Sequence, residues 1–382
     1  MVISKLSYFR KKKSKYLSTY AQVPKKVLIV PLDWGLGHAT RDIPLIHELL
    51  NAGCEIVIAA EGKHAALLAA EFPRITMLPL PGYHIRYSQK GFFFGLKIIR
   101  QIPKIWRAVR FEQAWLRKTV AELGIHAVIS DNRFGLYHPD IPCVFISHQL
   151  LIKTPFGGVT ERLLQKINYR FIQRYTACWV PDFAGEPNLS GVLAHPPQLP
   201  AHTTYLGCLS RFEPMPGVEK KYDLLALISG PEPQRSNLEA LVLSQLRQMP
   251  GIRALIVSGR PDEAARQDVA PGITQVSHLN ARDLNEAMLA ADMVLCRSGY
   301  TTLMDLAKLN KKAILVPTPG QSEQEYLGKY LMQKGYFYSL PQHQFSLKKA
   351  LEAVKTFPFA AFQHGQDMTA YKTVVRAFVK TL

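Results

Sequence analysis

The chain has 382 residues and is 47% hydrophobic, which is enough for two domains of ordinary size, each with a core of its own. Its five cysteines are scattered and include no C-x-x-C pair, which argues against a disulfide framework or a structural zinc site and favours a reducing compartment. The formal net charge of +18 indicates an acidic partner, and the usual kinds are nucleic acid, an anionic membrane surface and acidic substrates.

Residues 1–25 form a basic N-terminal tail that contains no Asp or Glu. The tail lacks the apolar segment of a signal peptide, and no stretch of the chain approaches the roughly 20 apolar residues that span a bilayer. Two interpretations stay open, a disordered extension and an electrostatic contact with anionic lipid. We therefore expect a cytoplasmic protein that is peripheral at the inner face of the membrane.

A first α/β domain is predicted over residues 26–206. The apolar run 26–31 is typical of a strand buried on both faces. A glycine-rich turn, an amphipathic helix ending at Gly53 and a second strand at 55–60 follow it. This β-α-β unit predicts a doubly wound parallel sheet.

The first turn of this domain carries Gly35, Gly37 and His38. It is not the dinucleotide fingerprint, because the third glycine is missing from its required place. The two glycines allow a ligand to approach the backbone closely. His38 is expected at the carboxyl end of the first strand, where open α/β sheets bind ligands and where a histidine can act as a base near neutral pH. The alternative is a histidine that caps the helix.

Polar side chains also follow two later strands of this domain. The apolar run 127–130 leads into Asp131 and Arg133, and the run 143–146 leads into His148. Because the carboxyl ends of parallel strands meet at one edge of the sheet, we expect these side chains at the same edge as His38.

Residues 87–118 combine aromatic and basic side chains with almost no acid. This composition is typical of a helix that lies in a membrane interface, and the alternative is an amphipathic helix packed on its own domain. We favour an anionic membrane surface as the partner. Pro103 is expected to interrupt any single long helix. No nucleic acid is expected, because no recognised nucleic-acid-binding motif accompanies the charge.

The pattern restarts after a polar, proline-bearing linker at 207–221. A second doubly wound domain is predicted over 222–345, followed by C-terminal helices at 346–382 that are expected to pack back toward the first domain. Within this second domain, an apolar strand leads through Ser298 and Gly299 into a helix. Such a turn is either an ordinary crossover or a diphosphate site at a helix N-terminus.

These motifs together resemble glycosyltransferase family 28. The resemblance rests on the Gly-x-Gly-His sequence at 35–38, on Arg-Ser-Gly at 297–299 followed by Asp305, and on the pair Gln324 and Glu325. It implies a GT-B fold, in which two Rossmann-like domains face each other across a cleft. It also implies an inverting transferase that uses a nucleotide-diphosphate sugar, usually UDP-linked, without a bound metal. No cofactor is expected, since the UDP-sugar is a co-substrate.

The resemblance also implies roles for individual residues. Asp305 would hold the ribose hydroxyls, Gln324 and Glu325 would contact the sugar, and His278 and Leu279 would frame the base. The diphosphate would be bound by the turn Ser298, Gly299, Tyr300 and Thr301, and by the loop with Ser229 and Gly230, where Arg235 would compensate for two prolines. His38 matches the family's base and His148 a site near the acceptor that often carries Glu, so either histidine could deprotonate the acceptor. The donor and acceptor cleft would include Gly35, Gly37, Asp131 and Arg133.

The predicted function is therefore an inverting transfer of a hexose or N-acetylhexosamine from a UDP-sugar to a hydroxyl of a lipid-linked or membrane-surface acceptor. Two alternatives stay open. A nucleotide-sugar hydrolase would use water as the acceptor, with Arg41 near the Gly-x-Gly-His turn. A non-catalytic protein would use the basic surface to bind a membrane or a polyanion.

Overall fold

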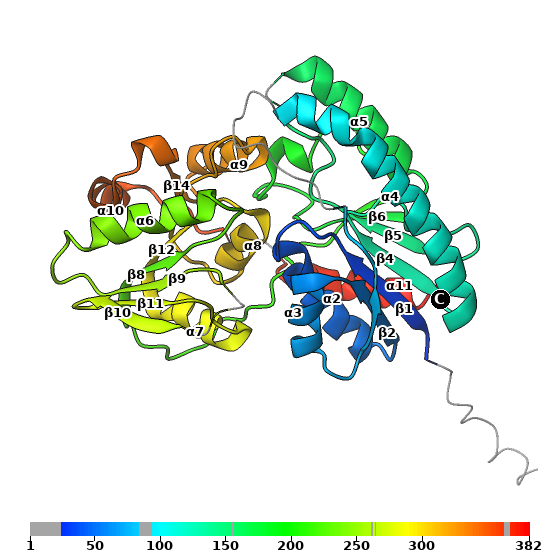
Figure 1. Ribbon diagram of the computed structural model, residues 1–382, viewed down its shortest axis with the longest axis horizontal. Coiled ribbons are helices and arrows are strands. Elements are labelled where there is room, and N and C mark those ends of the chain that lie inside the picture. Colours follow the sequence, from blue (N-terminus) through cyan, green and yellow to red (C-terminus); the bar gives the residue numbers. More distant parts are fainter. Residues whose placement is uncertain (1–23, 84–93, 155, 261–262, 264, 363–366) are drawn as a thin grey trace, which may run out of the picture.

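The protein is described by a computed structural model that covers residues 24–83, 94–154, 156–260, 263, 265–362 and 367–382, without the side chains of 94–103. All but the last two residues of the basic tail, and residues 87–93 of the aromatic and basic segment, therefore lie outside the described residues. The described chain forms two seven-stranded sheets, each with helices on its faces (Figure 1). The α/β class with two doubly wound sheets is confirmed.

The first sheet is parallel throughout and has the strand order β3-β2-β1-β4-β5-β6-β7. Its central strands are apolar runs buried on both faces, as a sheet covered by helices requires. The strands are β1 (Lys26–Pro31), β2 (Glu55–Ala60), β3 (Thr76–Pro79), β4 (Ala127–Asp131), β5 (Cys143–Ile146), β6 (Ala177–Val180) and β7 (Thr203–Tyr205). The helices are α2 (Gly37–Asn51), α3 (Gly62–Glu71), α4 (Phe94–Leu123) and α5 (Gly158–Ile172), with a short 3-10 helix η2 (Gly191–Leu193).

The second sheet has the order β10-β11-β9-β8-β12-β13-β14, and β10 is its one antiparallel strand. The strands are β8 (Tyr222–Leu227), β9 (Ala254–Val257), β10 (Arg266–Ala270), β11 (Ile273–Val276), β12 (Ala291–Cys296), β13 (Ala313–Leu315) and β14 (Tyr338–Ser339). The helices are α6 (Gln234–Leu246), α7 (Ala281–Ala290), α8 (Tyr300–Lys308) and α9 (Ser322–Gln333), with a 3-10 turn η3 (Gln342–Gln344).

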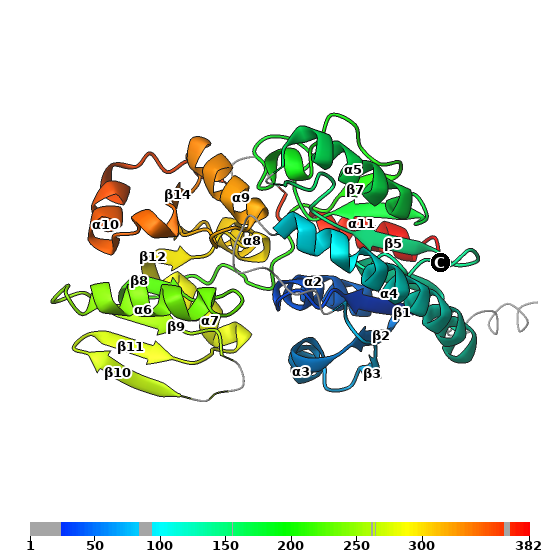
Figure 2. The same ribbon diagram turned by 45° about the horizontal axis from the view of Figure 1, so that its top comes forward.

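The two C-terminal helices pack on different domains. Helix α10 (Leu347–Thr356) shares a buried apolar cluster with α6 of the second domain. Helix α11 (Ala370–Val379) lies on the first domain, where Arg376 bonds Glu48 of α2 at 2.5 Å and Phe378 packs against Trp179 (Figure 2). Only α11 therefore makes the return that we expected of residues 346–382.

Helix α4 runs without a break through Pro103, so the expected interruption is wrong. A proline removes one main-chain donor, and a helix of 30 residues retains enough other hydrogen bonds to continue past it. No helix in the described part of the chain is both long enough and apolar enough to cross a membrane.

The two domains touch directly where α2 and α8 begin, and these helices lie opposite each other in Figure 1. Thr301 Oγ1 donates to the Gly37 carbonyl at 3.1 Å, and Tyr300 Oη donates to the Pro181 carbonyl at 2.8 Å. A Cβ on Gly37 would lie 2.8 Å from Thr301 Oγ1, so a larger residue here would displace the Thr301 hydroxyl from this contact between the domains. One buried apolar cluster continues from α2 of the first domain into α8 of the second.

Candidate active site

Each sheet reverses its strand order at one point, and that point is where open α/β sheets bind ligands. In the first sheet it lies between β1 and β4, and in the second it lies between β8 and β12. His38 follows β1, and Asp131 is the last residue of β4, in register with Pro31. Gly230 follows β8 and Gly299 follows β12. The topology thus brings the predicted base and the predicted diphosphate turn to facing edges.

A compact polar cluster occupies the first switch point. Nδ1 of His38 lies 3.0 Å from Oδ2 of Asp131, and the guanidinium of Arg41 grips both oxygens of that carboxylate, with Nε at 2.7 Å from Oδ2. Arg41 and Asp131 are buried, whereas the His38 side chain keeps 12% of its surface exposed. Nδ1 also lies 2.9 Å from Nη2 of Arg41, which can only donate, so the partner of Nδ1 depends on the tautomer. In the tautomer in which Nδ1–H donates to Asp131, the lone pair of Nε2 is left available as a base.

The charges in this cluster are set by burial and by each other. Burial alone would raise the pKa of Asp131, yet the adjacent Arg41 and His38 hold it below its usual value, so this carboxylate is ionised. Burial lowers the pKa of His38, against the opposing effect of Asp131, so the imidazole is neutral at neutral pH. Burial and then the charge of Asp131 raise the pKa of Asp42 well above its usual value.

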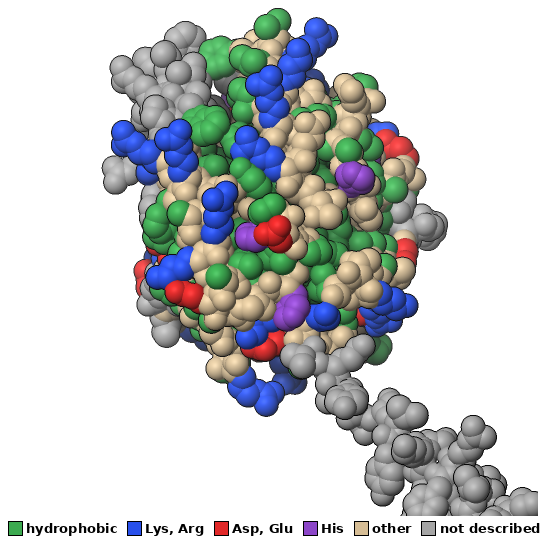
Figure 3. All heavy atoms as spheres, turned by 90° about the vertical axis from the view of Figure 1, so that its right-hand side faces the viewer, with side chains coloured by type: hydrophobic (Ala, Val, Ile, Leu, Met, Phe, Trp, Pro, Cys, Tyr) green, Lys and Arg blue, Asp and Glu red, His purple; other side chains and the backbone are tan. Residues whose placement is uncertain are grey.

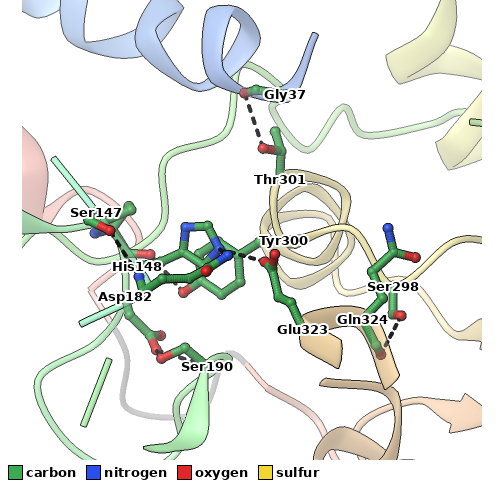
Figure 4. Close-up of polar contacts among 12 residues, drawn as sticks. Gly37, Ser147, His148, Asp182, Ser190, Ser298, Tyr300, Thr301, Glu323 and Gln324 are labelled. Carbon is green, nitrogen blue, oxygen red and sulfur yellow. Dashed lines mark hydrogen bonds and ion pairs between the residues drawn. The ribbon is translucent and has the colours of Figure 1, made fainter. Parts of the chain in front are cut away.

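His148 connects this cluster with the second domain. Its Nδ1 lies 3.1 Å from Nη1 of Arg41, and its Nε2 lies 2.7 Å from Oε1 of Glu323 on α9. The ring stacks on Tyr300 with centroids 4.0 Å apart and planes at 5°, and Figure 4 shows the two rings overlapping, with His148 turned toward Glu323. An arginine can only donate, so Nδ1 of His148 accepts and Nε2–H donates to Glu323. Both ring nitrogens of His148 are therefore occupied.

The second switch point presents backbone rather than charged side chains. Gly230 has φ of +111°, a conformation that favours glycine, in the exposed turn after β8. Gly299 caps α8, and a Cβ added there would meet nothing within 4 Å, so this helix N-terminus opens onto free space. Helix N-termini of this kind attract anions through their free N–H groups and dipole.

Arg297 lies directly behind this turn and is 1% exposed. Its guanidinium donates to the carbonyls of Val316, Pro317 and Gln234 and to the side chain of Gln342. No carboxylate contacts it among the residues that the structure describes, and its Nε has no hydrogen-bond partner there. Burial lowers its pKa to about 10, so the group is still a cation at neutral pH.

The residues expected around the nucleoside lie further along the same edge. Asp305 is half-buried on α8 and accepts a 2.5 Å hydrogen bond from Ser210 of the linker. Burial raises its pKa to about 7, opposed by Ser210 and Arg211. His278 is exposed and Leu279 half-buried in the loop after β11, and Ser229 is exposed after β8.

Two arginines that were predicted to contact a ligand are instead bound to other groups of the protein. Arg133 is buried on Glu112 and the Pro81 carbonyl, so it does not face the cleft. Arg235 pairs with Glu232 and the Gly259 carbonyl, so its guanidinium does not reach freely toward a diphosphate. Both predictions are wrong for the same reason. The sequence does not show which acidic residue pairs with each arginine.

The side chains of the donor turn are also engaged. The hydroxyls of Tyr300 and Thr301 make the contacts with the first domain described above, and Ser298 Oγ donates to the Gln324 carbonyl at 2.8 Å. This leaves the main chain of the turn for a ligand. The remaining predicted residues lie near it: Gln324 accepts from Thr318 N–H, Glu325 is exposed and accepts from Gly320 N–H, and the Gly35 carbonyl is held by His64.

Three residues of the cluster were absent from the predicted site. Arg41 was noted only for the hydrolase alternative, while Asp42 and Glu323 were not assigned a role. A signal for Arg41 and Asp42 was present, because two consecutive charged residues stand near the start of a helix whose other buried residues, apart from Glu48, are apolar. Glu323 could not be distinguished from its neighbours Gln324 and Glu325 without the phase of α9.

Comparison with known proteins extends this picture. Residues 234–375 match the model of the glycosyltransferase family 28 C-terminal domain. The chain is 34% identical over 344 residues to the UDP-N-acetylglucosamine--N-acetylmuramyl-(pentapeptide) pyrophosphoryl-undecaprenol N-acetylglucosamine transferase of Pasteurella multocida, covering 87% of this chain and 89% of the relative. It is 22% identical over 331 residues to an uncharacterised glycosyltransferase of Methanopyrus kandleri, with 81% and 90% covered.

Solved structures support the fold. MurG of Acinetobacter baumannii superposes with a TM-score of 0.55 at 16% identity, with 94% of this chain and 100% of that chain covered. The glycosyltransferase of kitacinnamycin gives a TM-score of 0.61 at 14% identity, with 94% and 95% covered. The expected GT-B arrangement of two facing Rossmann-like domains is thereby confirmed. With the family 28 C-terminal domain matched and a relative at 34% identity over most of its length, the chain belongs to glycosyltransferase family 28 and is a glycosyltransferase.

Proposed function

We propose that this enzyme transfers a sugar, with inversion, from a UDP-sugar to a hydroxyl of a lipid-linked acceptor at a membrane surface. The observation that carries the proposal is the direct contact between the two domains at Gly37. There the residue preceding His38 accepts a hydrogen bond from Thr301 of the donor turn, so base and diphosphate turn adjoin. The name of the Pasteurella relative, which specifies UDP-N-acetylglucosamine and an undecaprenol-linked acceptor, supports the choice of donor and acceptor class.

His38 is the proposed base. Its neutral imidazole, held on Nδ1 by ionised Asp131, takes the proton of the acceptor hydroxyl on Nε2. The hydroxyl oxygen then attacks the anomeric carbon as the bond from that carbon to the diphosphate oxygen breaks. Attack on the face opposite the leaving group inverts the configuration. His148 is not the proposed base, because both of its ring nitrogens are hydrogen-bonded.

The leaving UDP carries the negative charge that develops as the bond breaks. The open N-terminus of α8 at Gly299 offers main-chain N–H groups to that charge, and Arg297 adds a buried cation behind them. Asp305 is proposed for the ribose, with His278 and Leu279 near the nucleobase.

A second surface supports a membrane-bound acceptor. Val159, Leu163 and Ile167 form one row on α5 and are 82%, 60% and 42% exposed. Arg162, Lys166 and Arg170 of the same helix are exposed beside the row. The exposed Trp106 and Phe111, with the cations Lys104, Arg107 and Arg110, lie on the neighbouring helix α4.

We call this region the α4–α5 face. Both ribbon views show the two helices side by side, and Trp106 contacts Phe171 with ring centroids 5.7 Å apart. Apolar and basic side chains are interspersed on this side of the molecule (Figure 3). An apolar row flanked by cations is the composition that binds an anionic bilayer interface. The proposed location is therefore the cytoplasmic face of a membrane.

Turnover tests the proposal directly. Purified enzyme with UDP-N-acetylglucosamine and bacterial membrane vesicles should release UDP and label a lipid fraction, whereas omission of vesicles should leave little release. Release of free sugar at the full rate without vesicles would instead support the hydrolase. Failure of every UDP-sugar to bind or react would sink the proposal.

Membrane binding is tested separately by co-sedimentation with vesicles. Binding should require phosphatidylglycerol, weaken with salt, and fall at least ~10-fold in the triple variant Val159→Ser, Leu163→Ser, Ile167→Ser, because three exposed apolar groups no longer insert. The matched control is Leu50→Ser, which removes an exposed leucine on helix α2. Equal binding of the triple variant and the control would exclude the α4–α5 face.

A further inference from the structure

Glu323 has no part in the chemistry described so far, yet it crosses from one domain to the other. It stands in the first turn of α9, one residue before Gln324. Hydrogen bonds connect this part of α9 to the donor turn. The Gln324 carbonyl accepts from Ser298 Oγ, and the Gln324 side chain accepts from Thr318 N–H. The Glu323 carboxylate reaches in the opposite direction, to His148 of the first domain (Figure 4).

His148 passes this contact on to the base cluster. Its Nε2–H donates to Glu323 at 2.7 Å, and its Nδ1 accepts from Nη1 of Arg41 at 3.1 Å. The stacked ring of Tyr300 fixes the plane of the imidazole between these partners. A histidine held in this way has one tautomer and one orientation.

Arg41 in turn fixes the carboxylate that orients His38. The guanidinium is planar and rigid, so holding Nη1 on His148 sets the direction in which Nε and Nη2 meet Asp131. Asp131 then holds Nδ1 of His38 at 3.0 Å. An unbroken series of hydrogen bonds therefore runs from α9, beside the donor turn, to the proposed base.

We propose that Glu323 and His148 form a positioning pair, which holds Arg41 and through it the His38–Asp131 base in productive geometry when the two domains are closed. Opening of the domains separates Glu323 from His148 and removes the acceptor that fixes the imidazole. The base is then set only in the closed enzyme, where donor and acceptor meet. Neither member of the pair needs to touch the substrate. The inference rests on the proposed function for its rate measurements alone.

Rates provide the first test, with UDP-N-acetylglucosamine and membrane vesicles as substrates. Glu323→Ala should lower kcat ~10²-fold, because a small misplacement of a reacting group has an effect of this size, while the Kd for UDP changes little. Glu323→Gln keeps an acceptor oxygen for His148 and should lose only ~10-fold. The control is Glu186→Gln, which breaks another contact between the domains, with Lys334 at 3.1 Å, far from this chain of hydrogen bonds. Its kcat should stay near that of the wild type.

A double-mutant cycle separates positioning from direct contact with substrate. If Glu323 acts through His148, the combined variant Glu323→Ala with His148→Gln should be no slower than His148→Gln alone. Multiplied losses would mean that Glu323 contacts the substrate, which would overturn the proposal. A loss of kcat in Glu186→Gln equal to that in Glu323→Ala would also overturn it, because any contact between the domains would then suffice.

A measurement that needs no turnover keeps this inference distinct from the proposed function. Proton and nitrogen NMR of the imidazole rings should show a downfield, slowly exchanging Nε2–H of His148 in the wild type and in Glu186→Gln, because Glu323 accepts that proton, and Glu323→Ala should lose this signal. His148→Gln identifies the signal. Unfolding temperatures identify variants that fail to fold. An unchanged Nε2–H signal in folded Glu323→Ala would disprove the pair even if the enzyme proved inactive toward every UDP-sugar.

Discussion

Each half of the molecule buries one arginine at its switch point, and the two are held in opposite ways. Arg41 follows β1 and is 2% exposed, and Arg297 follows β12 and is 1% exposed. Arg41 is neutralised by both oxygens of Asp131. Arg297 is held by carbonyl and amide oxygens, without a carboxylate among the residues that the structure describes.

This difference separates two tasks. At the switch point of the first sheet, which we call the first edge, Asp131 balances the charge of Arg41. The proton-accepting nitrogen of His38 therefore operates in a neutral, preorganised setting. At the second edge the buried charge is unbalanced within the protein, and an isolated buried cation is costly. A diphosphate seated at Gly299 would offset that cost. The comparison therefore predicts that the first edge governs the rate of reaction and the second governs the affinity for the donor.

The largest expected effect is at the first edge. His38→Ala should lower kcat ~10³-fold, because a positioned general base contributes about this much, and it should leave the Kd for UDP within a factor of about two. Steady-state kinetics and calorimetry with UDP measure the two quantities. Activity of the wild type should persist below pH 6.5, because burial lowers the pKa of His38 from that value and the base loses its lone pair only below the lowered pKa. A variant that keeps its turnover would move the base elsewhere.

The next effect is at the second edge. Arg297→Gln should weaken UDP binding about tenfold, which corresponds to roughly 1.4 kcal/mol, and the loss should shrink as salt is added. Arg41→Gln is the matched variant, and it should lower kcat while the Kd for UDP is retained. Unfolding temperatures of both variants show whether the fold is intact. If the two variants had the same profile, the separation of rate from affinity would be wrong.

The sequence could predict the parts of the site that follow from topology. His38, Asp131 and Gly299 stand at strand ends, and parallel strands bring such ends to one edge. It could not predict which partner each long side chain chooses. Arg133 and Arg235 appeared free for a ligand, but Glu112 and Glu232 occupy them.

Helix phase explains the remaining miss. Glu323, Gln324 and Glu325 are consecutive, and successive residues of a helix point about 100° apart, so only one of them can face the other domain. Glu323 does so, whereas Glu325 is exposed and bonds Gly320 N–H. Which residue faces the gap depends on where α9 begins, and the boundaries of elements are the features that a sequence pattern defines least sharply.

The smallest expected effect concerns two aspartates, one at each edge, whose pKa values are shifted in opposite directions. Burial raises the pKa of Asp305 from 3.8 to about 7, so the folded state holds this proton more tightly than the unfolded chain does. The resulting stability is complete below pH 3.8 and is lost as the pH rises through about 7. Asp131 has a lowered pKa despite its burial, because of Arg41, so its contribution is present above pH 3.8 and is lost as the pH falls.

Thermal unfolding between pH 2 and 8 distinguishes the two. The unfolding temperature of Asp305→Asn should increase by a few degrees relative to that of the wild type as the pH rises, because the variant has no carboxyl group to ionise at this position. Asp131→Asn should be less stable than the wild type at neutral pH, and the difference in unfolding temperature should narrow as the pH falls below 3.8. Parallel curves for the two variants would show that the edges do not differ in how they hold charge. Opposite slopes would extend the contrast between the two arginines to the carboxyl groups beside them.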